Sequence, residues 1–215
     1  MRILKNVIRV AAVVAALVVS PAQAEVDAPD TVIRGAAEAL ASALRDDRET
    51  LETDSDALYQ LINSILEPRF DQKYAAQLVL GRSWRTASDA QKTAFIDAFY
   101  NTMLRRYADG VLQFDEERMT VLPYKPGKQG KKKNPRTKVK TSVVLDDGTE
   151  VPVDYGLVLR ADGWKVYDVV IEGISYVRNF RTELNAEVTA KGLDAVIARL
   201  QSEAGMSAAE PATAL

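Results

Sequence analysis

Few side chains are available for catalysis, because the 215-residue sequence contains neither histidine nor cysteine. This composition excludes Ser-His-Asp and Cys-His nucleophile systems, thiolate chemistry and every histidine-ligated metal site. Asp168 and Glu172 stand four residues apart in a predicted strand, and hence on the same face. They could form a catalytic carboxylate dyad, but pairing with arginines is the more ordinary interpretation. We therefore predict no catalytic residue and no metal site, and we expect a protein that is not an enzyme.

Two pairs of arginines are candidates for binding an anionic group. Arg82 and Arg85 flank Trp84, and Arg178 and Arg181 follow a predicted strand-to-helix turn. The planar guanidinium group suits phosphate oxygens, so any of the four could neutralise a phosphate at the mouth of a pocket. The alternative for each is an ordinary ion pair at the surface.

A basic run interrupts an otherwise acidic chain. Eight positive charges fall within 16 residues, at Lys125, Lys128, Lys131, Lys132, Lys133, Arg136, Lys138 and Lys140. Intervening glycines and prolines predict a loop between two strands. This loop is either a solvated hairpin tip or a contact for anionic groups or an acidic partner surface. Gly127 and Gly130 lack the spacing of a phosphate-binding loop, so no nucleotide site is predicted.

The first 24 residues have the pattern of a cleaved export signal. Basic residues at positions 2, 5 and 9 precede an apolar run at 10–19, and Ala22-Gln23-Ala24 matches an A-x-A cleavage site. A non-cleaved anchor is the alternative, but the run is shorter than the roughly 20 residues that a membrane helix needs. Removing the signal leaves 25 basic and 30 acidic residues. That net negative charge argues against a nucleic-acid partner.

The remaining chain is predicted to start with helices. Apolar residues recur at helical spacing after Asp30, again at 58–65, and in a short helix over 72–80 that ends at Gly81. Ser88 and Gln91 have the spacing of a capping box. The helix that follows carries apolar side chains every four residues from Phe95, and Gly110 stands near its end.

The middle of the chain is predicted to form strands. The segments 137–145, 150–160 and 163–171 are rich in β-branched and aromatic residues, and Gly148 and Gly163 supply the turns between them. A further strand is expected around 118–124. Two helices follow, around 177–188 and 193–200, and a disordered tail is expected from Ala204. This order predicts a single α+β domain over residues 25–203, with a twisted antiparallel sheet of about four strands.

Several segments are familiar as a set. The stretch LGRSWRTAS at 80–88 leads into the helix that starts near Gln91, and GWKVYDVVIEGIS at 163–175 continues into VRNFR at 177–181 and KGLD at 191–194. In this order and spacing they closely resemble the MlaC family of periplasmic phospholipid-binding proteins, also known as the toluene-tolerance family. The resemblance covers about residues 57–201.

The resemblance implies N- and C-terminal helices wrapped with the sheet around a deep apolar pocket for acyl chains. It also implies a monomeric periplasmic carrier without a cofactor, whose cargo is a phospholipid. Such a carrier would shuttle between an outer-membrane lipoprotein complex and an inner-membrane ABC transporter with MCE domains, maintaining outer-membrane lipid asymmetry.

Strand alternation and helix faces suggest which apolar side chains would line such a pocket: Phe95, Phe99, Met103, Tyr107, Val143, Val151, Val153, Tyr155, Leu157, Trp164, Val166, Val169, Ile171, Ile174, Val177 and Phe180. Head-group or partner contacts are expected from Arg82, Arg85, Arg178, Arg181, Lys131, Lys132 and Lys133. Two other functions stay open: a cone-like α+β enzyme with a buried carboxylate, and a chaperone-like interaction module.

Overall fold

The computed structural model describes residues 27–125 and 135–206. The expected export signal and Lys131, Lys132 and Lys133 lie outside these ranges. The helices are α1 (Pro29–Thr53), α2 (Ser55–Leu66), α3 (Gln72–Leu80), α4 (Asp89–Val111), α5 (Tyr176–Lys191) and α6 (Leu193–Glu203). The strands are β1 (Met119–Val121), β2 (Arg136–Val144), β3 (Glu150–Arg160), β4 (Gly163–Ile171) and β5 (Ile174–Ser175). Short 3-10 turns occupy Glu67–Arg69, Ser83–Arg85 and Glu116–Arg118.

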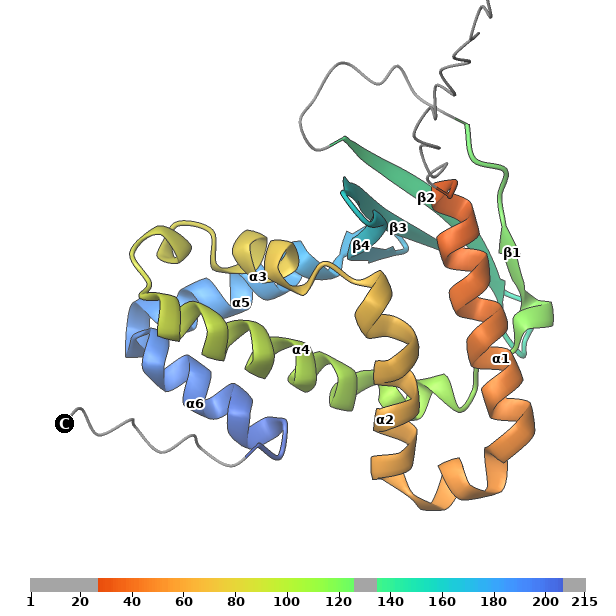
Figure 1. The fold of residues 1–215 in the computed structure, drawn as a ribbon, viewed down its shortest axis with the longest axis horizontal. Helices are drawn as coiled ribbons and strands as arrows, with labels where there is room; N and C mark the ends of the chain where they lie inside the picture. The colour runs from red at the N-terminus through yellow and green to blue at the C-terminus, as the bar shows by residue number, and fades with distance from the viewer. Residues whose placement is uncertain (1–26, 126–134, 207–215) are drawn as a thin grey trace, which may run out of the picture.

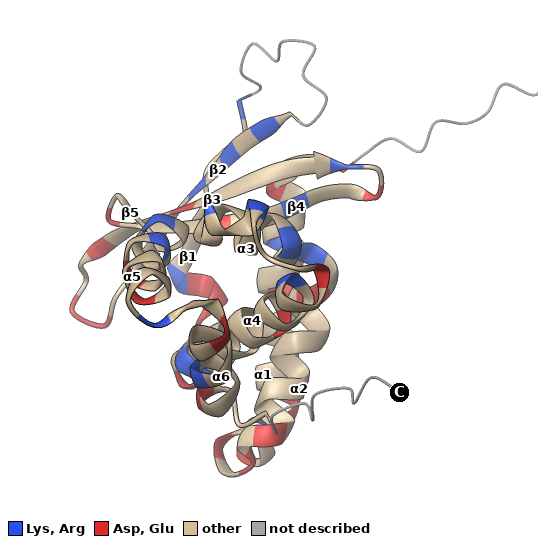
Figure 2. Cartoon of the chain, turned by 90° about the vertical axis from the view of Figure 1, so that its left-hand side faces the viewer, with Lys and Arg blue, Asp and Glu red and all other residues tan. Residues whose placement is uncertain are grey.

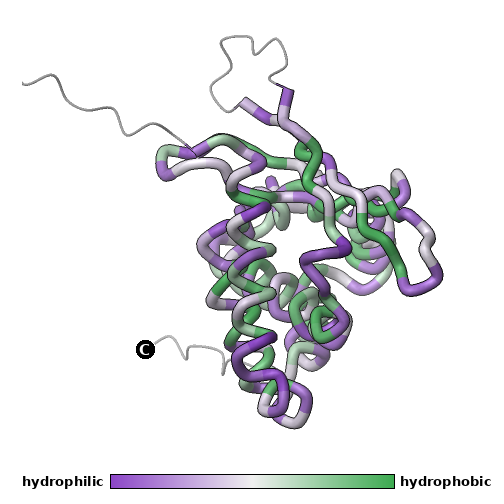
Figure 3. The backbone as a smooth tube through the Cα atoms, turned by 90° about the vertical axis from the view of Figure 1, so that its right-hand side faces the viewer, coloured by the Kyte–Doolittle hydropathy of each residue, from purple (hydrophilic) through white to green (hydrophobic). Residues whose placement is uncertain are grey.

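The helices form two groups beside the sheet (Figure 1). α1 and α2 make a helical hairpin whose first helix runs past the sheet, while α3, α4, α5 and α6 make a bundle beside this hairpin, on the same side of the sheet (Figure 2). The view in Figure 3 shows that the turn of the α1–α2 hairpin, far from the sheet, is hydrophilic. Of the helices in the described ranges, none is long and apolar enough to span a membrane.

Local sequence signals set the ends of these helices. The capping box at Ser88 is present, with the side chains of Ser88 and Gln91 each accepting from the other's backbone N–H. Asp71 accepts from the backbone N–H of Tyr74 at 2.9 Å and caps α3. Its other carboxylate oxygen accepts from Arg160 at 2.6 Å, which ties the start of α3 to the end of β3. The predicted bounds of α3 are confirmed.

The sheet is an antiparallel meander in the order β1-β2-β3-β4-β5. The predicted bounds of β3 and β4 are confirmed, and β5 adds a two-residue strand to the four that were expected. Arg136, Lys138 and Lys140 occupy alternate, exposed positions of β2, where Figure 2 shows a series of basic bands. This part of the basic run therefore lies on an outer face of the sheet.

A β-bulge lies in β4. Gly156 of β3 is opposite Asp168, while the next residue, Leu157, is opposite Val166, so Tyr167 has no partner in the ladder. A bulge shifts the two-residue alternation by one position. The sequence of β4 therefore contains two overlapping apolar sets. Val166 before the bulge and Val169 after it are three residues apart, yet both side chains face the same side of the sheet.

Three buried clusters hold the fold together. The largest joins α3, α4, α5 and α6 around Phe95, Phe180 and Leu184. A second packs the start of α1, through Ile33, onto the sheet, and a third joins α1, α2 and α4. α6 ends at Glu203, the predicted domain boundary, but Ala204 is only 1% exposed and packs on the fold. Residues 207–215 of the expected tail lie outside the described ranges.

Candidate functional site: two apolar chambers and a polar cleft

A large cavity lies between α1, the α4–β1 connection and the sheet. This larger chamber has a volume of about 940 Å³. α1 contributes a stripe of small and apolar side chains to its wall: Val32, Ile33, Ala36, Ala37 and Leu40. The sheet and the start of the β2–β3 turn contribute the opposite wall: Val143, Val144, Leu145, Val153, Tyr155, Val166, Val169 and Ile171. The chamber is therefore a largely apolar, partly open space between one helix and the sheet.

A second cavity, the smaller chamber, lies among α2, α3, α4, α5 and β4 and has a volume of about 350 Å³. Its wall is almost wholly apolar and aromatic, with Phe99, Met103 and Tyr107 from α4 and Tyr176, Val177 and Phe180 from α5. The two chambers share five wall residues: Leu66, Phe70, Val111, Val169 and Ile171. The two chambers therefore adjoin each other.

The β4 bulge places consecutive stretches of one strand on the same wall. Val166 precedes the bulge and Val169 and Ile171 follow it, yet all three line the larger chamber. Tyr167, the extra residue, lines the smaller chamber and packs edge-on against Tyr74 with ring centroids 5.0 Å apart. Gly156 permits this arrangement, because a Cβ there would lie 3.1 Å from the Tyr167 ring.

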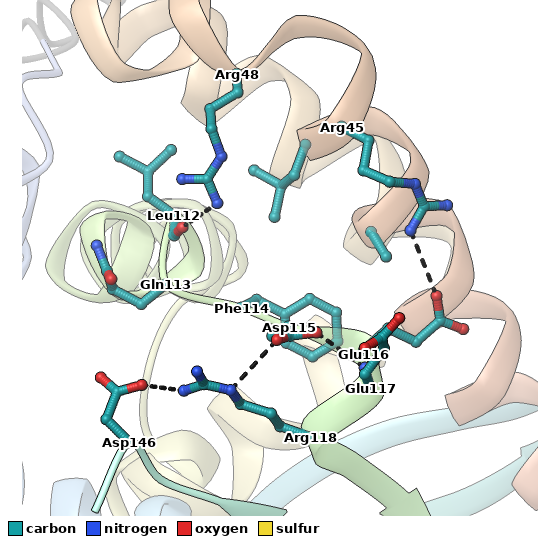
Figure 4. Close-up of a pocket in the computed structure, with 12 residues that line it drawn as sticks. Arg45, Arg48, Leu112, Gln113, Phe114, Asp115, Glu116, Glu117, Arg118 and Asp146 are labelled. Atoms are coloured by element: carbon teal, nitrogen blue, oxygen red, sulfur yellow. Dashed lines mark hydrogen bonds and ion pairs between the residues drawn. The ribbon is translucent and has the colours of Figure 1, made fainter.

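A third cavity, the polar cleft, adjoins the larger chamber and has a volume of about 380 Å³ (Figure 4). It is lined by the second half of α1, the α4–β1 connection and the turn between β2 and β3. Its charged side chains are Arg45, Arg48, Asp115, Glu116, Glu117, Arg118 and Asp146. Gln113, Phe114, Asp115, Arg118 and Asp146 line both this cleft and the larger chamber. Three of the five charged residues that line the larger chamber, Asp115, Arg118 and Asp146, thus also line this cleft.

Two titratable side chains line the smaller chamber in defined surroundings: Asp168 is held by hydrogen bonds, and Tyr100 is buried. The Asp168 carboxylate accepts from the Ser175 hydroxyl at 2.7 Å and from the backbone N–H of Val177 at 3.0 Å. It therefore anchors the start of α5. Burial, with a smaller contribution from Glu67, raises the pKa of Tyr100 to about 12. The Tyr100 phenol therefore keeps its proton at neutral pH.

The expectation that Asp168 and Glu172 share one face of a strand is wrong. β4 ends at Ile171, and Glu172 is an exposed turn residue with a φ of 50°, so the two carboxylates do not share a strand face. Within the described ranges, no group of three or more acidic side chains is placed to hold a metal ion.

Eleven of the apolar side chains expected at the pocket do line one of the two chambers: Phe99, Met103, Tyr107, Val143, Val153, Tyr155, Val166, Val169, Ile171, Val177 and Phe180. Five others do not. Phe95, Leu157 and Trp164 are buried in packed clusters, Val151 lines neither chamber, and Ile174 is 63% exposed at the sheet edge. Alternation and helix faces place a residue on a side of its element, but cannot distinguish packed core from cavity wall.

The four arginines expected at a pocket mouth lie elsewhere. Arg82, Arg85, Arg178 and Arg181 are exposed and line none of the three cavities. The Arg181 guanidinium instead packs beside Gly81, about 3.2 Å from where a Cβ would stand. The arginines that border the apolar space are Arg69 and Arg118. Arg69 donates to the carbonyl oxygen of Ile65 at 2.6 Å.

The residues that sequence reasoning missed come mostly from α1 and from the segment after α2. The apolar stripe of α1 was predicted, but as a face that packs rather than as a cavity wall. Phe70 lies in the short link before α3, where the sequence has no periodicity. The available signal was the pair of alanines at positions 36 and 37, because small side chains on an inward face leave space.

The buried hydroxyl of Tyr100 gives the first testable prediction. It has no hydrogen-bond partner among the described residues, and an unpaired buried polar group costs about 1–3 kcal/mol. Tyr100→Phe should therefore raise the free energy of unfolding, by about 1 kcal/mol. Urea denaturation followed by circular dichroism measures the change. A loss of stability of similar size would show that the hydroxyl has a partner in solution.

The same residue predicts the response to alkaline pH. The pKa of Tyr100 is about 12 in the folded protein, against about 10 in an unfolded chain. Below about pH 10 the tyrosine keeps its proton in both the folded and the unfolded protein. Between about pH 10 and about pH 12 it ionises only in the unfolded protein, so the free energy of unfolding falls as the pH rises. Burial also raises the pKa of Tyr155. Urea midpoints at about pH 9 and about pH 11 should fall less in Tyr100→Phe than in the native protein; equal falls would contradict this assignment.

A sheet, a helical hairpin and a helical bundle that surround adjoining apolar chambers define an α+β protein built to hold an apolar ligand. The family comparison agrees, since the family model described as MlaC protein matches residues 34–202. The chain therefore belongs to the MlaC family, as its sequence motifs predicted.

Three similar proteins illustrate the match. The toluene tolerance protein ttg2D of Pseudomonas putida is 26% identical over 77% of this chain and 75% of its own length. The intermembrane phospholipid transport system binding protein MlaC of Haemophilus influenzae is 22% identical over 82% of both chains. A solved phospholipid-binding protein from Ralstonia solanacearum, in complex with a phospholipid, superposes with a TM-score of 0.71 at 22% identity. That superposition covers 83% of this chain and 98% of the other, and it confirms the fold.

Proposed function

We propose that this protein is a periplasmic phospholipid carrier that encloses acyl chains in the larger and smaller chambers. The observation that carries the proposal is a pair of adjoining apolar chambers with a charged cleft beside the larger one. A phospholipid has the same division, with long apolar chains attached to one charged head group. The related proteins whose names refer to phospholipid binding or transport support the same ligand class.

The energetics explain why a carrier needs an enclosed space. Two acyl chains contain about 30 methylenes, and exposing each to water costs about 0.8 kcal/mol, so unassisted transfer faces a barrier of more than about 20 kcal/mol. Side chains that replace the surrounding water remove most of that barrier. The net affinity must stay well below the gross transfer free energy, since the cargo has to be released.

Family membership supports the wider role. The carrier would exchange phospholipid between an outer-membrane lipoprotein complex and an inner-membrane ABC transporter with MCE domains, and so help to maintain outer-membrane lipid asymmetry. It would act as a monomer, without catalysis and without a cofactor. The expected export signal is consistent with the periplasm as its place of action.

Native mass spectrometry tests the central claim. The protein purified from the periplasm should carry a stoichiometric mass adduct, and lipid extraction should identify that adduct as phospholipid. A ligand-free mass that stays unchanged after incubation with phospholipid vesicles would overturn the proposal. For the wider role, a strain that lacks this protein should expose more phospholipid to an external phospholipase, and unchanged exposure would contradict it.

A further inference from the structure

The inward face of α1 changes character along its length. Its first part, up to Leu40, lines the larger chamber with apolar side chains. Its second part lines the polar cleft with Ala41, Leu44, Arg45 and Arg48. Leu40 and Arg45 are separated by about 8 Å along the helix axis, at 1.5 Å per residue, and α1 bends at Asp47, just before Arg48. The inward side of α1 therefore passes from an apolar wall to a basic one, and a ligand in the chamber would extend its polar end into the cleft.

The cleft contains paired charges of both signs. Arg45 lies 3.8 Å from Glu116, and Arg118 contacts both Asp115, at 3.3 Å, and Asp146. Arg48 pairs with Glu52 at 3.0 Å and also donates to the carbonyl oxygen of Leu112 at 3.1 Å. Glu117 lines the cleft and forms no ion pair within the described part of the chain. Three guanidinium groups thus share the cleft with four carboxylates, counted from its lining residues.

We propose that the polar cleft is a head-group subsite that selects zwitterionic phosphate head groups, such as phosphoethanolamine, over anionic ones. The proposal rests on the proposed carrier function. A phosphate can replace carboxylates as the partner of Arg45 and Arg118, because guanidinium binds phosphate oxygens in the same planar geometry. The ammonium group of the same head group then pairs with the displaced carboxylates, Glu116 among them, and with the neighbouring Glu117. A phosphoglycerol head group brings the phosphate without the cation, and leaves those carboxylates unpaired beside it.

The expected selectivity is modest, because these side chains are partly exposed to solvent. The side chains of Arg45, Arg48 and Arg118 are 67%, 51% and 45% exposed. Ion pairs of this kind contribute about 0.2–1 kcal/mol, which corresponds to a preference of up to about fivefold. Salt weakens such pairs, so the preference should decrease as ionic strength rises.

Lipid exchange measures the preference directly. The delipidated protein is incubated with vesicles that contain equal amounts of phosphatidylethanolamine and phosphatidylglycerol with identical acyl chains, and the bound lipids are quantified. Phosphatidylethanolamine should be enriched about two- to fivefold over the vesicle ratio at low salt. A bound ratio equal to that of the vesicles would overturn the proposal while leaving the carrier function intact. Absence of any bound lipid would instead refute the carrier function itself.

A pair of charge-matched variants locates the selectivity. Glu116→Gln/Glu117→Gln removes two carboxylates from the cleft, and should bring the bound ratio to parity or below. Glu38→Gln/Glu183→Gln removes two exposed carboxylates that line none of the three cavities, and should keep the native ratio. A native ratio in the first variant, or parity in the second, would refute the assignment to this cleft.

The cleft could instead serve soluble phosphate compounds. Calorimetric titration with glycerophosphoethanolamine, and separately with inorganic phosphate, distinguishes the two sources. If a lipid head group occupies the cleft, the lipid-loaded protein should bind neither compound, while the delipidated protein binds glycerophosphoethanolamine weakly. Equal binding by the loaded and delipidated proteins would show that the cleft is not a lipid subsite, and would overturn the proposal.

Discussion

Ala37→Trp should leave the protein folded but unable to retain lipid. Ala37 is half-buried in α1 and lines the larger chamber, so an indole ring at this position would project into space that the native side chain leaves open. A ring that displaces about four methylenes of an acyl chain removes about 3 kcal/mol of transfer free energy, at about 0.8 kcal/mol each. The affinity for phospholipid should therefore fall by about 100-fold.

The measurement is the fraction of protein that carries a lipid adduct in native mass spectra, with circular dichroism and thermal unfolding as checks on folding. Ala198→Trp provides the matched control, since Ala198 is exposed on α6 and lines none of the three cavities. That variant should keep the full lipid load. A full load in folded Ala37→Trp would show that acyl chains do not occupy the larger chamber.

Phe95→Ala should affect stability far more than cargo. The Phe95 ring is completely buried and stacks on Phe99, with centroids 5.6 Å apart, but it lines neither chamber. Removing a buried phenylalanine costs about 3–5 kcal/mol, a large part of the 5–15 kcal/mol that stabilises a typical domain. Phe95→Leu keeps most of the volume and should cost less than about 1.5 kcal/mol.

Met103→Ala is the contrasting variant. Met103 is half-buried on the same helix and lines the smaller chamber, so its truncation should cost less than half as much stability and should alter the lipid load. Urea denaturation and native mass spectrometry on the same samples separate the two effects. A Phe95→Ala protein of native stability that has lost its lipid would show that this ring is a cavity wall rather than packed core.

The elements of this fold could be predicted because their signals are local. The capping box at Ser88, the glycine after α3 and the turn glycines at 148 and 163 each act within a few residues of the boundary they set. The bulge in β4 could not be predicted. It depends on how β3 pairs with β4, and only its symptom, an uncertain alternation of apolar residues, is visible in the sequence.

The candidate site was less predictable than the fold. Sequence reasoning found the sheet wall and the α4 and α5 faces of the chambers, since those residues are large and regularly spaced. It expected head-group or partner contacts from Arg82, Arg85, Arg178 and Arg181, whereas the arginines that line the polar cleft are Arg45, Arg48 and Arg118. Isolated arginines carry no sequence signal that distinguishes a cleft from an outer surface, because the distinction depends on contacts between distant segments such as α1 and the β2–β3 turn.

Tyr167 makes β4 one residue longer than its pairing with β3 requires. In a relative whose strand lacks this extra residue, an ungapped sequence alignment would be displaced by one position after Val166. It would then match a wall residue such as Val169 with a residue that faces the opposite side. Strand register gives a dependable reference, because Asp168 lies opposite Gly156 and fixes the facing of the residues that follow. Comparisons of cavity walls among relatives should therefore be aligned on this cross-strand pair. Each single-residue insertion or deletion in the strand then reverses the side that the following residues face.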